Sequence, residues 1–573
     1  MYTLEKIFKI IDQYDIISFD VFDTVLLRPF VKPSNVFDYI EYKYNIKGFS
    51  KARKTVVVNT VKEKSIEDIY NQMPRQYFEY MPIELGEEKR LVYPNKKMKE
   101  VYLYALKKNK KIIFTSDIYF HSVFLSELLE ANGFGRCEKI YSSCDYQKTK
   151  CTGELFKQLL DDFDISSSQL IHIGDNIVSD DAVPKSLGIN TILIESNFEQ
   201  YTSYRNYLNE KDYLFWDSFI IKMCADNYSN RAYTGTDEEQ CWHRFGYEVA
   251  GPICWCFVKW LKSEIDSDNS NISDVAFIAR DGYLLKRMFD SLSLDKKVKS
   301  HYVLAPRILA TLLQESFISA KDAQKLKQSE ISTINDVYQL EIYSKEERDR
   351  FIFDLGKEYG KYLECFKFGD GVIAVVDSTT NNLSSQKLVD SFTNNSTCGM
   401  YWFASQYAFS LNYNIKTCQE ERYPVIESED LFELIFKSPE PTIKRFCKDG
   451  SFDYNSINES EESRIANFPF IEKGAMEFFE DAERHKLEGF PAAHIINKYL
   501  IRYCENPDEQ ERAIIEKGLC SGGIANSIWE PTKVFIDKKK NRTPIAIKKK
   551  LKRAIIKHPK LFILLRKIVH KIQ

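Results

Sequence analysis

Acidic side chains follow hydrophobic runs at two places near the start of the chain. Asp20 comes directly after the run IISF (16–19), and Asp175 and Asp180 come after the run LIHIG (170–174). Such runs are typical of strands buried in a parallel sheet, and ligands bind these sheets at the carboxyl ends of the strands. A carboxylate there is a candidate nucleophile or metal ligand, although a single acid at a strand end is more often placed for solvation.

Two further segments supply the groups that a carboxylate needs to attack phosphorus. The run KKIIFTSD (110–117) ends in two hydroxyls, of which we favour Ser116 and keep Thr115 as the alternative; Lys150 stands just before a helix-like segment. Attack of one anion on another requires a divalent cation and an ammonium group to cancel their repulsion. Further carboxylates must hold the cation, and a hydroxyl can bind a phosphoryl oxygen. The combined set predicts phosphoryl transfer to Asp20.

The segments between these residues alternate between strand and helix patterns. This alternation predicts a doubly wound α/β fold with a parallel sheet. Helix-like segments with Ser34 and Ser65 as N-caps fill most of the chain from 33 to 108. An insertion after the first strand would lie as a helical cap over Asp20. The expected strands are 16–19, 110–117, 137–143, 169–175 and 191–195.

Residues 10–200 resemble the haloacid dehalogenase (HAD) superfamily of hydrolases. The family's first motif, Asp-x-Asp-x-Thr after a hydrophobic strand, is matched by FDVFDT (19–24), and its fourth by GDNIVSD (174–180). Ser116 takes the place of the second motif. Lys150 takes that of the third, six residues before Phe156, although the prolines of that motif are absent.

This resemblance implies a role for each matched residue and a Mg²⁺ cofactor. Asp20 would be the nucleophile, with Ser116 and Lys150 also catalytic. The metal ligands would be Asp20, the Phe22 backbone carbonyl, Asp175 and Asp180. Substrate contacts would come from Thr24, Thr115 and Asn176.

One position departs from the family pattern. The second Asp of the first motif, the general acid and base of the phosphatases, is Phe22 here, and Asp23 follows one residue later. Asp23 could act as the acid, protonation could come from elsewhere or be unnecessary, or the domain could bind phosphate and metal without efficient turnover. Dehalogenases of the superfamily also lack this acid, but they work without metal, so a metal-dependent phosphatase ranks first. The longer pattern is similar to predicted hydrolases of bacterial surface polysaccharide synthesis, which implies a phosphorylated sugar or related metabolite as substrate.

A second α/β Rossmann-like domain is expected at 201–415. Its strand ends would present Arg280, Asp281, Arg307 and Asp377. These residues form either a possible second site for a phosphorylated ligand, with the arginines as clamps, or ordinary helix caps. A polar run from 377 to 386 before the next helix could offer backbone NH groups to an anion.

The remaining chain divides into two parts. A mainly helical region is expected at 416–530, with a polar loop at 446–464, followed by a basic amphipathic tail at 531–573. From 538 to 573 there are fourteen Lys or Arg residues and no acid. Such a helix would bind an anionic membrane surface, although it could instead fold onto the acidic body or stay unfolded.

Bulk composition excludes several classes. With 573 residues, 44% hydrophobic, the chain is long enough for several soluble domains, and it has no run of about 18 apolar residues and no signal peptide. We therefore expect a cytoplasmic protein, peripheral on the inner face of the membrane if the tail docks there. Its thirteen cysteines lack a CxxC pair and are expected to be reduced, and the acidic body argues against nucleic acid as partner. The alternative to an enzyme is a membrane-docked glycan transferase or assembly protein whose first domain only binds phosphate.

Overall fold

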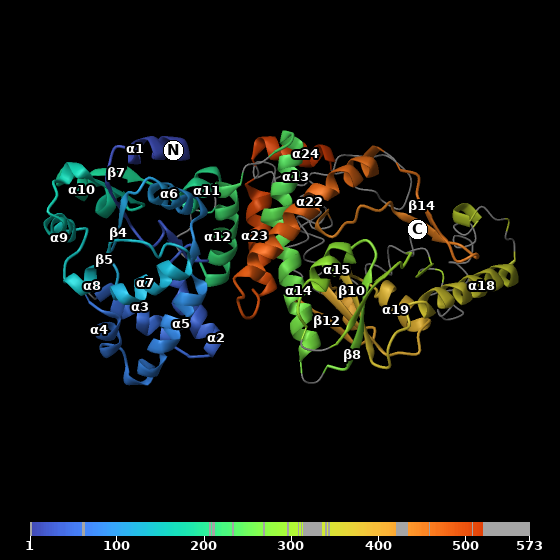
Figure 1. Cartoon of the computed structure of the whole chain (residues 1–573). Helices are drawn as coiled ribbons and strands as arrows, with labels where there is room; N and C mark the ends of the chain where they lie inside the picture. The colour runs from blue at the N-terminus through green and yellow to red at the C-terminus, as the bar shows by residue number, and fades with distance from the viewer. Residues whose placement is uncertain are drawn as a thin grey trace, which may run out of the picture. The chain divides into compact units, whose positions relative to one another are not determined.

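The computed structural model describes most of the chain between residues 3 and 518, and contacts between residues divide it into two compact units (Figure 1). Unit 1 comprises 1–233 with 484–488, and unit 2 comprises 234–483 with 489–573. The described range has gaps at 60–63, 206–207, 209–212, 232–233, 268–269, 295–296, 307–308, 311, 313–334, 339–340, 342–343, 420–433, 458 and 507. The finer division at 200, 415 and 530 stays a prediction.

Unit 1 is built on a five-stranded parallel sheet in the order β5-β4-β1-β6-β7. The α/β class predicted from the sequence is therefore confirmed. Strands β4 and β5 follow β1 on one side of it, and β6 and β7 are then added on the other side of β1. The strand order thus reverses between β1 and β6, where open α/β sheets bind their ligands. The strands are β1 (Ile16–Phe19), β4 (Lys111–Ser116), β5 (Lys139–Ser142), β6 (Leu170–Gly174) and β7 (Asn190–Leu193).

Helices pack on both faces of this sheet because each carries an apolar stripe. On one face α9 buries Leu155, Phe156 and Leu159 against Ile113 and Leu170 of the strands. This burial removes apolar surface from water and stabilises the packing of α9 against the strands. The helices that follow or flank the strands are α1 (Leu4–Ile11), α6 (Lys96–Lys107), α7 (Ser122–Ala131), α8 (Ser143–Tyr146), α9 (Glu154–Phe163), α10 (Val183–Ser186), α11 (Asn197–Tyr204) and α12 (Phe215–Asn230).

The chain between β1 and β4 forms a helical insertion. It leaves the sheet through β2 (Leu26–Leu27) and returns through β3 (Tyr93–Pro94), and these two short strands pair antiparallel. Figure 1 shows the inserted helices gathered on one side of unit 1. Helix α6, inside the expected 33–108 cap, packs instead against α1 and β4. The inserted elements are α2 (Asn35–Tyr44), α3 (Phe49–Asn59), α4 (Ile66–Asn71), η1 (Arg75–Tyr80) and α5 (Met81–Leu91).

Buried charges hold the insertion together. Arg53 of α3 and Glu84 of α5 are both fully buried and form a two-bond ion pair at 2.7 and 2.8 Å. Tyr70 adds a hydrogen bond to Glu84, and the Arg53 guanidinium packs on the ring of Phe37. Because both charges are paired, their burial is compensated, and removing one partner would leave a buried charge alone.

Unit 2 contains a second five-stranded parallel sheet, in the order β12-β11-β10-β8-β9. The expected second α/β domain is thus present as a parallel sheet. Here the strand order reverses between β8 and β10. The strands are β8 (Ile272–Ile278), β9 (Lys299–Val303), β10 (Val372–Thr380), β11 (Thr397–Ala404) and β12 (Ile415–Thr417).

Long helices accompany this sheet, and the region expected to be mainly helical also contains a hairpin. The hairpin is formed by β13 (Ile443–Phe446) and β14 (Phe452–Tyr454), so the loop predicted at 446–464 is partly wrong. Phe446 and Phe452 pack on each other and join the core beside the sheet, which favours the paired strands over an open loop. The helices are α13 (Asp237–Phe245), η5 (Gly246–Ala250), α14 (Gly251–Asp266), α15 (Gly282–Asp290), α18 (Lys345–Glu364), α19 (Ser384–Ser391), α20 (Gln406–Phe409), α22 (Glu459–Arg484), α23 (Ala493–Glu505) and α24 (Glu509–Gly518).

Three further expectations concern membrane-spanning helices, disulfides and the basic tail. In the part of the chain that the structure describes, no helix combines the length and the apolar character needed to cross a membrane. No disulfide joins the described cysteines. The basic tail at 531–573 lies outside the described residues.

Candidate active site

The register of unit 1 brings three strand ends to one level. Phe19, the last residue of β1, pairs with Phe114 on one side and with Ile173 on the other. The next residues, Asp20, Thr115 and Gly174, therefore stand side by side at the edge of the sheet. Asp20 continues the ladder by donating its backbone NH to the Ile173 carbonyl at 2.9 Å, so its position is fixed by the sheet itself.

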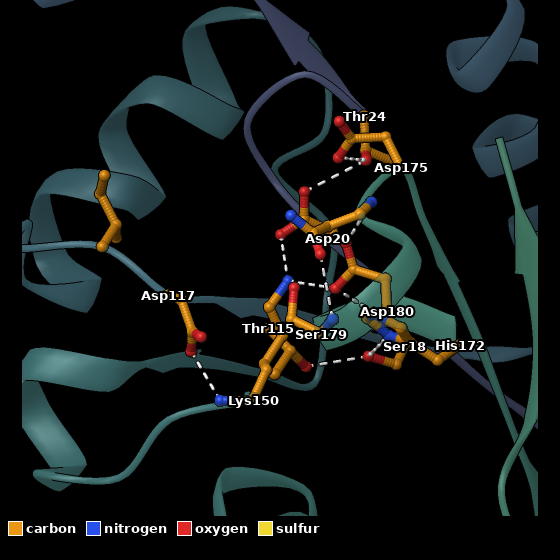
Figure 2. A network of polar contacts seen from close by, with 12 residues as sticks. Ser18, Asp20, Thr24, Thr115, Asp117, Lys150, His172, Asp175, Ser179 and Asp180 are labelled. Carbon is orange, nitrogen blue, oxygen red and sulfur yellow. Dashed lines mark hydrogen bonds and ion pairs between the residues drawn. The ribbon is translucent and has the colours of Figure 1, made fainter. Parts of the chain in front are cut away.

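Asp20 lies against Lys150 at the point where the strand order reverses (Figure 2). Lys150 Nζ donates to Asp20 Oδ1 at 2.5 Å and to Asp180 Oδ1 at 2.6 Å, and all three side chains are buried. Although burial alone would lower the pKa of Lys150, the two carboxylates raise it well above its usual value. The sequence placed these residues 130 and 30 positions apart, and the fold brings them into direct contact.

Asp175 completes a cluster of three carboxylates. Asp20, Asp175 and Asp180 each offer an oxygen, and these oxygens lie within 4.8 Å of one another. Thr24 Oγ1 lies 3.1 Å from Asp20 Oδ2 and 3.3 Å from Asp175 Oδ1, so it can donate to either. Burial and the charges of Asp20, Asp23 and Asp180 raise the pKa of Asp175 to about 8, and burial raises that of Asp20 to about 7. Lys150 contacts Asp20 and Asp180 but cannot neutralise all three acids, which leaves the cluster short of positive charge.

Asp180 is held by a buried relay that was not predicted from the sequence. His172 Nε2 lies 3.1 Å from Asp180 Oδ1, and His172 Nδ1 lies 2.9 Å from Ser18 Oγ, which is 2.8 Å from Thr115 Oγ1 (Figure 2). Burial lowers the pKa of His172, which favours the neutral ring. Because an ionised Asp180 can only accept, Nε2–H donates to it, and in the neutral ring Nδ1 then accepts from Ser18. Although burial works against it, the Lys150 charge and the His172 hydrogen bond hold the pKa of Asp180 well below its usual range. A polar residue at matched positions of neighbouring apolar strands, Ser18 beside His172, was the available sequence signal.

The two candidate hydroxyls of β4 differ in their surroundings. Thr115 points into the relay with Ser18, whereas Ser116 makes no hydrogen bond through its hydroxyl to any residue that the structure describes. Next to them, Asp117 accepts hydrogen bonds from the backbone NH groups of Lys150, at 2.7 Å, and Cys151. Asp117 therefore positions the lysine loop, and the geometry favours Ser116 as the hydroxyl available to a ligand.

The Phe22 and Asp23 side chains lie in different surroundings. The Phe22 ring is packed beneath the Arg28 guanidinium, 3.9 Å from its centre, and beside Phe120. Arg28 is itself buried and paired with Glu88 of α5 at 3.0 Å. Asp23 adopts a left-handed backbone (φ 60°), and its charge contributes to the raised pKa of both Asp175 and Arg28. Asp23 is therefore the acidic residue of this turn that lies near the carboxylate cluster.

The turn after β6 has little room for side chains. A Cβ at Gly174 would lie 2.5 Å from Asp180, so the close approach of Asp180 requires glycine. Asn176, predicted to contact substrate, caps this turn: its Oδ1 accepts from the NH groups of Val178 and Ser179 at 3.0 and 3.1 Å. Its contact with a substrate stays a prediction.

In unit 2, three of the four predicted second-site residues lie near the reversal between β8 and β10. Arg280 and Asp281 follow β8, and Asp377 lies in β10. Ser378 Oγ donates to Asp281 across the reversal, and Ser385 Oγ donates to Asp377 at 2.9 Å. Arg307 lies outside the described residues.

Arg280 is a partly buried cation without a carboxylate partner among the described residues. Its Nη1 donates to Thr442 Oγ1 at 2.6 Å, its Nε is buried without a hydrogen bond, and no ion pair links it to the described part of the chain. Gly282 lets α15 begin directly against β8, since a Cβ there would lie 2.8 Å from Phe277. The N-caps of α15 and α19, Asp281 and Leu383, make no side-chain cap bond.

Comparisons with known proteins find similarity in solved structures only. No family model matches this chain, and no curated protein matches it. A HAD-family enzyme from Bacteroides thetaiotaomicron, solved with magnesium and inorganic phosphate, aligns over 32% of this chain and 95% of its own, with 15% identity and a TM-score of 0.24. A HAD phosphatase from Thermococcus onnurineus aligns over 32% of this chain and 86% of its own, with 13% identity and a TM-score of 0.25. An L-2-haloacid dehalogenase aligns over the same shares of the two chains, with 11% identity and a TM-score of 0.26. Identities and TM-scores this low carry no conclusion about the activity of this chain.

Proposed function

We propose that unit 1 is a magnesium-dependent hydrolase of HAD type that removes phosphate from a phosphorylated sugar or related metabolite. One observation carries this proposal: Asp20, Asp175 and Asp180 meet within 4.8 Å beside the buried ammonium of Lys150. The resemblance assigns these residues to the first, third and fourth motifs of the family, with Ser116 in the second, and this supports the proposal. A role in surface polysaccharide synthesis is proposed from the sequence resemblance alone.

The carboxylate cluster fits a hard divalent cation. Mg²⁺ prefers oxygen ligands, and the three carboxylates, with the Phe22 backbone carbonyl as a further proposed ligand, would supply them. Burial and the neighbouring carboxylates raise the pKa of Asp175, and a bound cation would offset the charge of those neighbours. A bound Mg²⁺ would offset the negative charge on the transferring phosphoryl group.

The side chains then divide the reaction between them. The Asp20 carboxylate attacks phosphorus, an Asp–O–P bond forms, and the bond from phosphorus to the leaving oxygen breaks. Lys150 holds Asp20 in place and reduces the repulsion between the two anions, while the Ser116 hydroxyl donates to a phosphoryl oxygen. Water hydrolyses the resulting aspartyl-phosphate, which releases phosphate and restores Asp20.

Asp23 is the proposed general acid. Phe22 cannot carry a proton, and its ring is packed beneath Arg28. The charge of Asp23 contributes to the raised pKa of Asp175, which supports a position of its carboxyl near the cluster. It would give its proton to the leaving oxygen.

This function is tested by measuring phosphate release from a panel of sugar phosphates by the purified full-length protein in the presence of Mg²⁺. Native protein should release phosphate, and Asp20→Asn should lower the rate by about 10³-fold or more, with Asp161→Asn, an exposed acid of α9, as matched control. Unchanged turnover in Asp20→Asn would exclude the proposed nucleophile.

A second variant separates the acid from the nucleophile. Asp23→Asn should slow the release of phosphate from sugar phosphates, whose leaving groups need a proton. It should have little effect on p-nitrophenyl phosphate, whose leaving group does not. An equal loss on both substrates would contradict the role of Asp23 as acid.

The alternative is a membrane-docked transferase or assembly protein of glycan synthesis whose unit 1 binds phosphate without efficient turnover. The presence of Phe22 where phosphatases have their acid favours this alternative. Thermal stabilisation by phosphate and Mg²⁺ without phosphate release from any substrate would support it. Metal-independent halide release would instead support a dehalogenase.

A second ligand site is proposed in unit 2, where Arg280 lies at the sheet reversal without an ion pair among the described residues. A phosphorylated ligand could pair its anion with Arg280 and its hydroxyls with Asp281 and Asp377. Isothermal titration of Asp20→Asn protein with uridine diphosphate, without Mg²⁺, should show binding that Arg280→Gln weakens. Equal binding by both proteins would contradict this site.

Docking of residues 538–573 on an anionic membrane surface also remains a proposal. Deleting them should lower binding to phosphatidylserine-containing vesicles and leave phosphate release intact. Equal vesicle binding by the deletion variant would contradict it.

A further inference from the structure

A second set of potential metal ligands lies at the same sheet edge of unit 1, outside the proposed catalytic cluster. His121 ends the loop between β4 and α7, while Cys144 and Asp145 lie in α8 directly after β5. Their donor atoms lie within 4.8 Å of one another. None of the three has a role in the proposed phosphoryl transfer.

The distances between these donors approach those of a zinc site. Cys144 Sγ lies 3.9 Å from His121 Nδ1 and 4.0 Å from Asp145 Oδ1, and the last two atoms are 2.6 Å apart. Usual zinc bond lengths in tetrahedral geometry separate sulfur from nitrogen or oxygen by about 3.6 Å and nitrogen from oxygen by about 3.3 Å. If each side chain moved by less than about 1 Å, the three donor atoms could therefore coordinate one zinc ion.

The outer contacts of these ligands also match a metal site. His121 Nε2 lies 3.2 Å from Glu67 Oε2, and a carboxylate on the second ring nitrogen is the usual partner of a zinc-bound histidine. Without metal, His121 Nδ1 lies 2.6 Å from Asp145 Oδ1 and donates to it, so zinc would replace this proton while Nε2–H stays on Glu67. The other Asp145 oxygen accepts from the Ser122 NH at 2.8 Å, which orients Oδ1 toward the site.

We propose that His121, Cys144 and Asp145 bind one zinc ion. A thiolate, an imidazole and a carboxylate together suit Zn²⁺ and not Mg²⁺, whose preferred ligands are oxygens. His121 is 46% exposed, so water can reach the fourth coordination position.

Zinc here would join two parts of unit 1. Ile118 of the His121 loop already contacts the start of α8, since its NH donates to Ser143 Oγ at 2.9 Å. The same loop carries Asp117, which holds the backbone of Lys150. Glu67 belongs to α4 of the insertion, so a zinc-bound His121 would fix a contact between the insertion and a loop that supports the catalytic lysine.

Cobalt titration of the full-length chain tests the site. After chelator treatment, with excess Mg²⁺ present to occupy the carboxylate cluster, one equivalent of Co²⁺ should give a thiolate-to-cobalt absorption band that one equivalent of Zn²⁺ removes. Cys144→Ser should abolish the band, whereas Cys365→Ser, an exposed cysteine of unit 2, should retain it. Glu67→Gln should lower zinc affinity by about 10- to 100-fold.

His121→Gln provides an independent check because its side chain is partly exposed and its loss should not unfold the chain. Circular dichroism of each variant confirms folding. Absence of the band in the native chain, its persistence in Cys144→Ser, or unchanged affinity in His121→Gln would each overturn the proposal.

Discussion

Both units place polar side chains where the strand order of a parallel sheet reverses, but the charges at the two reversals differ. In unit 1 three carboxylates surround a lysine that contacts two of them. In unit 2 Arg280 has no ion pair in the described part of the chain, and Asp281 and Asp377 accept hydrogen bonds from serines. The same topology therefore presents three carboxylates around a paired lysine in unit 1, and two carboxylates beside an arginine without an ion pair among the described residues in unit 2.

This difference shows what the topology does and does not decide. Parallel strands and their crossover helices fix where a ligand can bind, whereas the side chains at the strand ends fix its charge. We propose that unit 1 binds a divalent cation together with a phosphoryl group and that unit 2 binds an anion at Arg280.

Removing the cation of each reversal should have unequal effects on stability. Lys150→Met should destabilise unit 1 by about 3–5 kcal/mol, because it leaves buried carboxylates without their partner. Arg280→Met should cost about 1 kcal/mol, since it loses a single hydrogen bond to Thr442. Hydrogen exchange of peptides from β1 and β8 in metal-free protein measures both, and equal effects would refute the contrast.

Magnesium should stabilise unit 1 and not unit 2. At 100 times its dissociation constant, a ligand that binds only the folded state contributes about 2.7 kcal/mol. This protection should be lost in Asp175→Asn and kept in Asp281→Asn, a matched change at the other reversal. Protection of β8 peptides by Mg²⁺ would show that the metal does not distinguish the two sites.

The effect of pH on Mg²⁺ binding should likewise be confined to unit 1. Asp20 and Asp175 have pKa values raised to about 7 and 8, so their contribution to stability is present at about pH 4 and is lost as the pH rises through these values. Mg²⁺ binds the ionised carboxylates, so its affinity should rise between pH 5.5 and 7 by about tenfold per pH unit for each proton displaced. Calorimetric titration in two buffers of different ionisation enthalpy measures these protons, and a pH-independent affinity would contradict the raised pKa values.

The smallest expected effect concerns the relay behind Asp180. Ser18→Ala removes the hydrogen bond to His172 Nδ1 and should cost about 1 kcal/mol. It should also weaken Mg²⁺ binding modestly by loosening His172, whereas Ser378→Ala should leave Mg²⁺ binding unchanged. Identical behaviour of the two variants would argue against a role of the relay in positioning Asp180.

The strand ends were predictable because they combine a hydrophobic run with an abrupt polar residue. Asp20, Asp175 and Asp180 were selected on this pattern, and the alternation of strand and helix segments predicted the α/β class. The strand order, which places β1 beside β6, was not predicted and is known only from the fold.

Contacts that depend on tertiary packing could not be predicted from the sequence. His172 lies in an apolar run and looks like a core residue until its neighbour Ser18 is known. The packing of Phe22 beneath Arg28 depends on Glu88, 60 residues further along the chain than Arg28. The β13–β14 hairpin was missed because its polar sequence hides Phe446 and Phe452, which gain their burial only from the fold.

The short β2–β3 pair has a consequence for how proteins with the fold of unit 1 could diversify. Leu27 lies opposite Tyr93, so the chain leaves the sheet and rejoins it at neighbouring positions. Everything between these positions can lengthen, shorten or be exchanged without changing the register of β1 against β4. Natural variation or grafting of the insertion at this junction could therefore change substrate selection without moving the side chains at the strand ends.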